Sequence, residues 1–172
     1  ITRNAGVAIT GKDILLIGAG GAAAGVLGPL LEQKPSSITV CNRTFSKAQA
    51  LVDQHADLAQ TQKVALLAQE QQALEGDFDI IINATAASLQ GAGIPVPASV
   101  LRAGSLAYDM MYGPAAAAFL QWAQAHGAVG RDGLGMLVEQ AAESFALWRG
   151  VRPPSGQVLQ ELREVLAQEA HA

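Results

Sequence analysis

Apolar residues gather in short runs along this chain, and each run ends at glycine, proline or polar residues. The first run, 13–17, has the length of a strand and is followed by a helix pattern over about 20–32. The alternation then repeats, with strands expected at 38–41, 64–67, 78–83, 105–108 and 128–130, and helices at 46–59, 115–125, 132–149 and 155–170. This spacing predicts an α/β fold, a Rossmann-type doubly wound parallel sheet of about six strands with helices on both faces.

The two ends of the chain suggest that something is missing. Residues 1–9 resemble the tail of a polar helix that leads into the first strand, and the chain begins at Ile1 rather than at methionine, so we expect a fragment. In the last helix, the large apolar side chains fall on one face. They are Val158, Leu159, Leu162, Val165 and Leu166.

The turn after the first strand has the spacing of a dinucleotide-binding loop. Gly18 permits a tight turn, Gly20 lets the backbone approach a pyrophosphate without a Cβ in the way, and Ala23 lets the helix pack close to the strand. The helix that follows directs unpaired N–H groups and its positive dipole end at the phosphates. Because a strand precedes the motif and a helix follows it, we interpret it as a dinucleotide site rather than a glycine-rich turn.

The residues after the second strand bear on the choice of cofactor. An NAD site places an acidic residue about twenty positions beyond the glycines, where a cation suits the 2′-phosphate of NADP. This chain has neither Asp nor Glu there but has Arg43, with Lys47 four residues later. The pattern favours NADP, and the alternative is an ordinary solvated helix start.

Composition narrows the class of protein. The 172 residues suit one domain, and 50% of them are hydrophobic while 15% are charged, which excludes a disordered chain. A net charge of −4 gives no basic surface for nucleic acid or an anionic membrane. The uncharged run 14–31 has the length of a membrane span, but Pro29 and five glycines interrupt it, so we expect a soluble, cytoplasmic protein.

The residues that most often bind metals or act as nucleophiles have simpler explanations here. The single cysteine, Cys41, lies within an apolar run and is expected to be a buried strand thiol. His55 is expected on a solvated helix face, since no other His or Cys stands at ligand spacing. We therefore expect no metal site.

Five motifs occur in an order that resembles shikimate dehydrogenase, specifically the C-terminal, NADP-binding domain of that family. They are the turn 18–22, the segment 42–44 with Lys47, the segment 83–85, the segment 108–112, and the segment 133–136 with Gln140. The resemblance covers nearly all of the chain, which we take as one NADP-binding domain, 1–172. It implies the reversible, NADPH-dependent reduction of 3-dehydroshikimate to shikimate in aromatic amino-acid biosynthesis.

The resemblance also implies roles for single residues. The pyrophosphate would be held by Gly18, Ala19, Gly20, Gly21 and Ala22, and the 2′-phosphate by Asn42, Arg43, Thr44 and Lys47. The ribose and nicotinamide would be bordered by Thr85, Met110, Gly133 and Met136, and the substrate by Tyr112 and Gln140. Two positions depart from the family: Lys47 replaces a frequent arginine, and Ala86 and Ala87 stand where a serine is frequent.

No catalytic residue is assigned within the chain. Ketone reduction needs an acid that protonates the oxygen, and in the family a lysine and an aspartate of an N-terminal domain do this. Asp109 would be ionised at neutral pH unless strongly desolvated, so it is not assigned that role. The last helix, 155–170, would pack toward the absent N-terminal domain, or else mediate a homodimer. The alternatives are a quinate/shikimate dehydrogenase paralogue and a non-catalytic dinucleotide-binding module.

Overall fold

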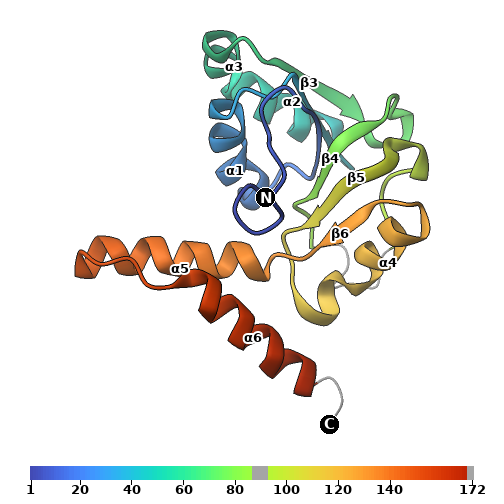
Figure 1. Cartoon of the computed structure of the whole chain (residues 1–172). Helices are drawn as coiled ribbons and strands as arrows, with labels where there is room; N and C mark the ends of the chain where they lie inside the picture. Colours follow the sequence, from blue (N-terminus) through green and yellow to red (C-terminus); the bar gives the residue numbers. More distant parts are fainter. Residues whose placement is uncertain (87–92, 170–172) are drawn as a thin grey trace.

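The computed structural model describes residues 1–86 and 93–169 and contains one six-stranded parallel sheet (Figure 1). The strand order is β3-β2-β1-β4-β5-β6, so the chain starts at the centre, moves to one edge, and returns to build the other half. This order confirms the doubly wound Rossmann-type fold. The strands are β1 (Asp13–Ile17), β2 (Ser37–Asn42), β3 (Ala65–Glu70), β4 (Phe78–Asn83), β5 (Leu101–Asp109) and β6 (Val129–Arg131).

Helices cover both faces of the sheet, as expected. Alternate residues of β1 supply the two cores: Ile14 and Leu16 pack on the side of the first three helices, and Leu15 and Ile17 on the side of the fourth. Because both faces are buried, β1 reads as a continuous apolar run. The helices are α1 (Gly21–Glu32), α2 (Phe45–Gln54), α3 (Ala56–Gln62), α4 (Ala117–Ala125), α5 (Leu134–Arg149) and α6 (Ser155–Glu169), with 3-10 segments η1 (Gln71–Ala73), η3 (Ala98–Val100) and η4 (Gly113–Ala116).

The topology places a crevice at one edge of the sheet. β1 lies between β2 and β4, and its last residue, Ile17, is in register with Cys41 on one side and Asn83 on the other. The connections from β1 and β4 leave in opposite directions, which is the switch point where ligands bind in open α/β sheets. The residues that follow these three strands therefore meet at one place.

Beyond the sheet, α5 projects away from the body, and the chain then turns back so that α6 packs against α5 at an oblique angle (Figure 1). We call these two helices and their connection, 134–169, the α5–α6 hairpin. Gly150, with φ +70°, ends α5 in the left-handed conformation that favours glycine. Among the described residues, no helix combines the length and apolarity needed to cross a bilayer, and the uncharged run 14–31 is divided between β1 and α1.

Two of the expected helices are wrong. The expected helix 46–59 is broken at His55, whose backbone (φ −110°, ψ 7°) leaves helical geometry and whose Nδ1 lies 3.0 Å from the carbonyl oxygen of Leu51. This break lets α3 turn and pack against α1. The first residues form a single turn rather than a helix tail, because Gly6 adopts φ +66°, which a right-handed helix cannot continue.

The fifth strand is longer than expected. β5 begins at Leu101, paired with Phe78, and its register with β4 shifts before Leu106 pairs with Ile80. Gly104, with φ +79°, lies within this irregularity. Gly104, which directly precedes the expected strand 105–108, therefore marks a bulge inside the observed strand.

Candidate functional site

A groove of about 380 Å³ lies at the carboxyl ends of β1, β2 and β4. Three segments that are far apart in the sequence meet in it. Of the residues proposed from the sequence for the cofactor, the structure brings together Gly18, Ala19, Gly20, Asn42, Arg43, Thr44, Lys47 and Thr85. Gly21 and Ala22 follow in the first turn of α1, where they are exposed.

The glycines of the first turn serve different purposes. Gly18 has φ +111°, and a Cβ there would lie 3.1 Å from the carbonyl oxygen of Ala84, so the fold itself requires glycine. Gly20 has an ordinary extended backbone (φ −93°, ψ −170°), and a Cβ at Gly20 or Gly21 would meet no atom within 4 Å. The chain's own packing does not explain these two glycines, but space for a ligand does. Ala23, fully buried, lets α1 approach the sheet.

The second wall of the groove carries positive charge without a partner. Asn42 donates from Nδ2 to the carbonyl oxygen of Thr44 (3.0 Å) and so shapes the turn into α2. Arg43 and Lys47 are exposed, and neither forms an ion pair with a carboxylate of the described residues. The first turn of α1 has no side-chain cap either, which leaves its N–H groups for an anion.

Sequence reasoning missed the opposite wall. Gln71, at the start of η1, lines the groove and donates from Nε2 to the carbonyl oxygen of Pro95, which also lines it. The two residues continue into an adjacent hollow of about 460 Å³, together with Arg43, Phe45 and Glu70. The rule that points to residues after a strand would have found Gln71, since it follows β3 at the same edge of the sheet.

A buried polar pair joins β4 and β5 beside the groove. Asn83 and Asp109 are in register, and Asn83 Nδ2 donates to Asp109 Oδ2 (3.0 Å). The second carboxylate oxygen, Oδ1, accepts from the backbone N–H of Met111 (2.8 Å). Asp109 is fully buried, and this burial raises the pKa of its carboxyl although the bonds from Met111 and Asn83 oppose the shift.

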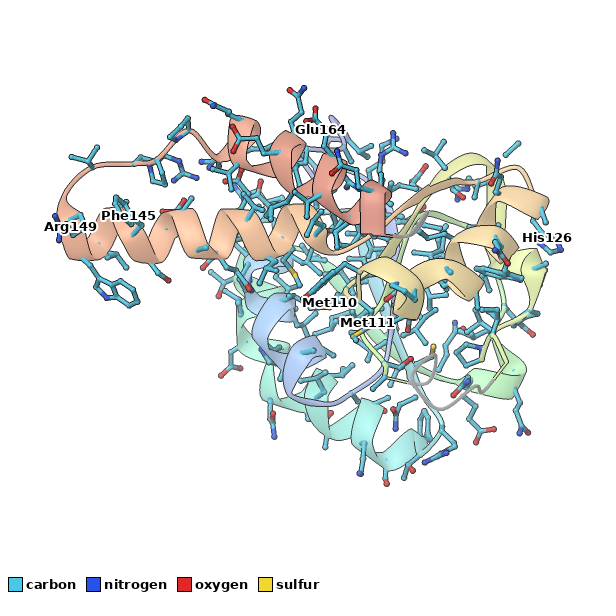
Figure 2. The ribbon with its side chains drawn as sticks, turned by 90° about the horizontal axis from the view of Figure 1, so that it is seen from below. Met110, Met111, His126, Phe145, Arg149 and Glu164 are labelled. Atoms are coloured by element: carbon cyan, nitrogen blue, oxygen red, sulfur yellow. The ribbon has the colours of Figure 1, made fainter. Side chains whose placement is uncertain are left out.

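Other residues proposed for the cofactor and substrate lie in a second groove, of about 830 Å³, between residues 1–4, α1 and α5. Met110, Met136 and Gln140 line it, and Figure 2 shows Met110 and Met111 beside the first turns of α5. Gly133 lines neither groove: it is buried, and its N–H donates to the carbonyl oxygen of Met111 (2.8 Å). A Cβ at Gly133 would overlap the carbonyl oxygen of Met110.

The remaining positions named from the sequence are Tyr112, Ala86 and Ala87. Tyr112 is exposed and lines neither of these two grooves. Ala86 lines the first groove where the family often has serine, and Ala87 lies outside the described residues.

No feature of the described chain points to metal or thiol chemistry. Within residues 1–86 and 93–169, no group of three His, Cys, Asp or Glu side chains could hold a metal ion. Cys41 is fully buried in β2, as expected, and burial raises the pKa of its thiol to about 12, so the thiolate is not formed at neutral pH. The candidate site therefore consists of a glycine-containing turn, two cations that form no ion pair with the described carboxylates, and a buried polar pair.

Comparisons with known proteins agree with this geometry. Residues 2–91 match the family described as shikimate / quinate 5-dehydrogenase, and residues 133–163 match the shikimate 5′-dehydrogenase C-terminal domain. A relative named shikimate dehydrogenase (NADP(+)), from Acidovorax ebreus (strain TPSY), is 71% identical over 167 residues, which are 97% of this chain and 59% of the relative. The chain therefore spans less than two thirds of that relative's length.

Two solved structures are similar over most of the chain. The Ael1 enzyme from Pseudomonas putida is 43% identical with a TM-score of 0.81, covering 94% of this chain and 58% of that one. Shikimate 5-dehydrogenase from Thermus thermophilus, solved in complex with NADP(H) and shikimate, is 28% identical with a TM-score of 0.77, covering 95% of this chain and 58% of that one.

Proposed function

We infer that this chain, which belongs to the shikimate / quinate 5-dehydrogenase family, forms the NADP(H)-binding part of a shikimate dehydrogenase. The activity proposed for the whole protein is the reversible, NADPH-dependent reduction of 3-dehydroshikimate to shikimate in aromatic amino-acid biosynthesis. NADPH supplies the hydride when bound. The residues of this chain hold the cofactor and present one side of the substrate.

The observation that carries this proposal is the pair of free cations beside the glycine turn. Arg43 and Lys47 line the same groove as Gly18 and Gly20, and neither has a carboxylate partner in the described part of the chain. A guanidinium and an ammonium together suit the dianionic 2′-phosphate that distinguishes NADP from NAD. The 71% identical relative is named for NADP(+), which supports the same assignment.

In this proposal the two grooves bind different parts of the cofactor and substrate. The first would take the pyrophosphate on 18–22 and the 2′-phosphate on Asn42, Arg43, Thr44 and Lys47. Thr85, Met110, Gly133 and Met136 would border the ribose and nicotinamide, which places the ring toward the second groove. Gln140 would contact the substrate there, and the exposed Tyr112, which lines neither groove, would contact it from the segment after β5. The acid that protonates the ketone oxygen would come from outside these 172 residues.

The proposal includes a partner and a location. The α5–α6 hairpin exposes large apolar side chains, and we assign them to contact with the N-terminal domain of the longer protein, or with a second copy where that domain is absent. The α6 stripe supports this, since Val158, Leu162 and Val165 remain exposed. We place the protein in the cytoplasm.

The test of cofactor choice is a fluorescence titration with NADPH and NADH. The chain should bind NADPH more tightly, and Arg43→Ala should lower the NADPH/NADH affinity ratio about tenfold or more, because a charge-assisted hydrogen bond contributes about 1.5 to 3 kcal/mol. Arg149→Ala is the matched control: it removes an exposed arginine at the far end of α5 (Figure 2) and should leave the ratio unchanged. An unchanged ratio in Arg43→Ala would show that Arg43 does not read the 2′-phosphate.

A further inference from the structure

We propose that Gln71 recognises the exocyclic amino group of the cofactor's adenine, and that its hydrogen bond to Pro95 fixes the amide so that its oxygen is left for the base. The inference deepens the proposed function and rests on it. Gln71 would thus determine the choice of base, whereas Arg43 and Lys47 are assigned to the 2′-phosphate.

The first step is the place of the base. The 2′-phosphate and the adenine are attached to neighbouring carbons of one ribose, so a phosphate bound at Arg43 brings the base close to the same side chain. The hollow of about 460 Å³ beside the cofactor groove shares Asn42 and Arg43 with that groove. This shared wall assigns the hollow to the purine.

The lining of the hollow suits a flat aromatic ring. Phe45, a large apolar side chain that is 40% exposed, lines it together with Pro95 and Arg43. Nucleic-acid bases stack on aromatic rings and on guanidinium groups, and this stacking accepts every base because each has a π-face. A choice between bases therefore requires a polar group at the same place.

The second step is the orientation of the Gln71 amide. Gln71 begins η1 directly after β3, and it donates from Nε2 to the carbonyl oxygen of Pro95. A carbonyl oxygen can only accept, so the amide nitrogen has to face Pro95. Both residues line the groove and the hollow, which places the amide at their boundary. Within the described part of the chain, no group donates to Oε1 of Gln71.

The third step compares two bases. Adenine has at C6 an amino group, which can donate to Oε1, whereas hypoxanthine has a carbonyl oxygen there, which cannot. A glutamine that is free to turn its amide over would accommodate either base. Turning the amide of Gln71 would break its hydrogen bond to Pro95, so the held amide favours adenine, the base that glutamine side chains also recognise in nucleic acids.

Two further acceptors line the hollow, Glu70 and Gln72. Both residues are exposed, and neither side chain is held by a hydrogen bond or ion pair with a described residue. Gln71 is half-buried and already held by Pro95, so it loses less side-chain freedom when a base binds. This difference assigns the recognition to Gln71 rather than to its two neighbours.

The experiment measures Kd for NADP+ and for its hypoxanthine analogue, which differs from NADP+ only in the base. The wild type should bind NADP+ about tenfold more tightly, because one complex gains a hydrogen bond and the other sets two acceptors against each other. Gln71→Met keeps the length of the side chain and should bring this ratio close to one. Gln72→Met, the matched control, and Glu70→Met should keep the ratio of the wild type.

A merely structural role of Gln71 predicts a different result. If Gln71 only holds Pro95 in place, Gln71→Met should weaken both cofactors by the same factor and leave their ratio unchanged, which would overturn the proposal. Equal affinity of the wild type for the two cofactors would overturn it without any variant, and so would a ratio near one in Gln72→Met or Glu70→Met. A wild type that binds neither cofactor would contradict the proposed function instead.

Discussion

The sheet's carboxyl edge and the α5–α6 hairpin differ in what they leave without a partner. At the sheet edge, within the described residues, the groups without a partner are mainly cations, glycine backbone and N–H groups, and the exposed large side chains there are Phe45 and Tyr112. On the hairpin the exposed groups are apolar: Leu147 is 84% exposed, Trp148 81% and Val151 65%. Figure 2 shows Phe145 and Arg149 on the part of α5 that extends beyond the body.

This difference indicates two kinds of missing partner. Free cations around a small groove match a compact polyanion, because charge-assisted bonds gain most from a partner of opposite charge. Large apolar side chains on a projecting hairpin match a protein surface, because only a broad contact removes their area from water. Under the proposed function, the first surface suits the cofactor and the second suits a protein neighbour.

The largest effect should appear in turnover. The chain should bind NADPH yet oxidise shikimate with NADP+ no faster than background, since general acid–base help is typically worth about 10² to 10⁴-fold and its acid is not assigned to this chain. A full-length relative serves as the positive control in the same assay, which follows the absorbance of NADPH. Turnover by the chain that Asp109→Asn or Tyr112→Phe abolishes would show that the acid lies on this side after all.

Two glycine substitutions should distinguish a glycine that leaves room for the ligand from a glycine that the packing of the protein requires. Gly20→Ala adds a methyl where the chain places no atom, so it should leave the melting temperature nearly unchanged but weaken NADPH about tenfold or more by contact with the pyrophosphate. Gly133→Ala should instead destabilise the fold by about 1 to 3 kcal/mol, because its Cβ would overlap the backbone of Met110. Chemical unfolding and NADPH titration of both variants give the comparison; a destabilised Gly20→Ala with normal affinity would contradict it.

Removing the exposed hairpin side chains should affect association alone. Leu147→Gln with Trp148→Gln should shift any concentration-dependent dimer toward monomer in sedimentation experiments, since burying each such side chain contributes about 1.5 to 3 kcal/mol. The NADPH affinity and the melting temperature of this double variant should equal those of the wild type. Leu67→Gln, at an exposed position of β3, is the matched control and should leave association unchanged. A double variant that unfolds would show that these side chains pack within the chain.

The smallest effect should come from the ion pairs that Glu139 forms within the hairpin and with Arg3. Glu139 on α5 accepts from Ser155 Oγ (2.9 Å), Arg3 Nη1 (2.9 Å) and Arg152 Nη2 (2.7 Å). Burial alone would raise the pKa of Glu139, but these bonds and the nearby guanidinium charges outweigh it and hold the pKa below its usual range.

A lowered pKa in the folded state means that this stabilisation is present above the ordinary glutamate pKa and is lost as pH falls through the folded value. Glu139→Gln should therefore reduce the free energy of unfolding near pH 7 by about 1 kcal/mol or less, with the difference disappearing in acid. Urea unfolding from pH 7 to pH 3 measures this. A difference that grows in acid would contradict the sign of the shift.

The elements that could be predicted from the sequence are those with local causes. β1 and β4 are apolar on both faces, and Gly18 stops β1, so their positions followed from composition alone. The break at His55 could not be predicted, because no glycine or proline marks it and its cause is the packing of α3 on α1. Residues 1–9 were misread because the left-handed Gly6 outweighs their helical pattern.

The site also contains residues that could be predicted from local sequence and residues that depend on the fold. Arg43 and the glycines were found because a motif carries them at fixed spacing. The pairing of Asn83 with Asp109 depends on the register of two strands 26 residues apart, which spacing alone does not give. Asp109 was considered only as an acid, whereas in the structure both of its carboxylate oxygens accept hydrogen bonds within the fold.

The contact between Gly133 and Met110 makes α5 a lever. Its 16 residues extend about 24 Å from this contact, so a tilt of about 5° at the first turn carries the far end by about 2 Å. Because no room for a methyl group separates Gly133 from the Met110 carbonyl, the helix cannot pivot there without moving Met110. A displacement of the exposed end of the hairpin would therefore act on Met110, directly after the end of β5.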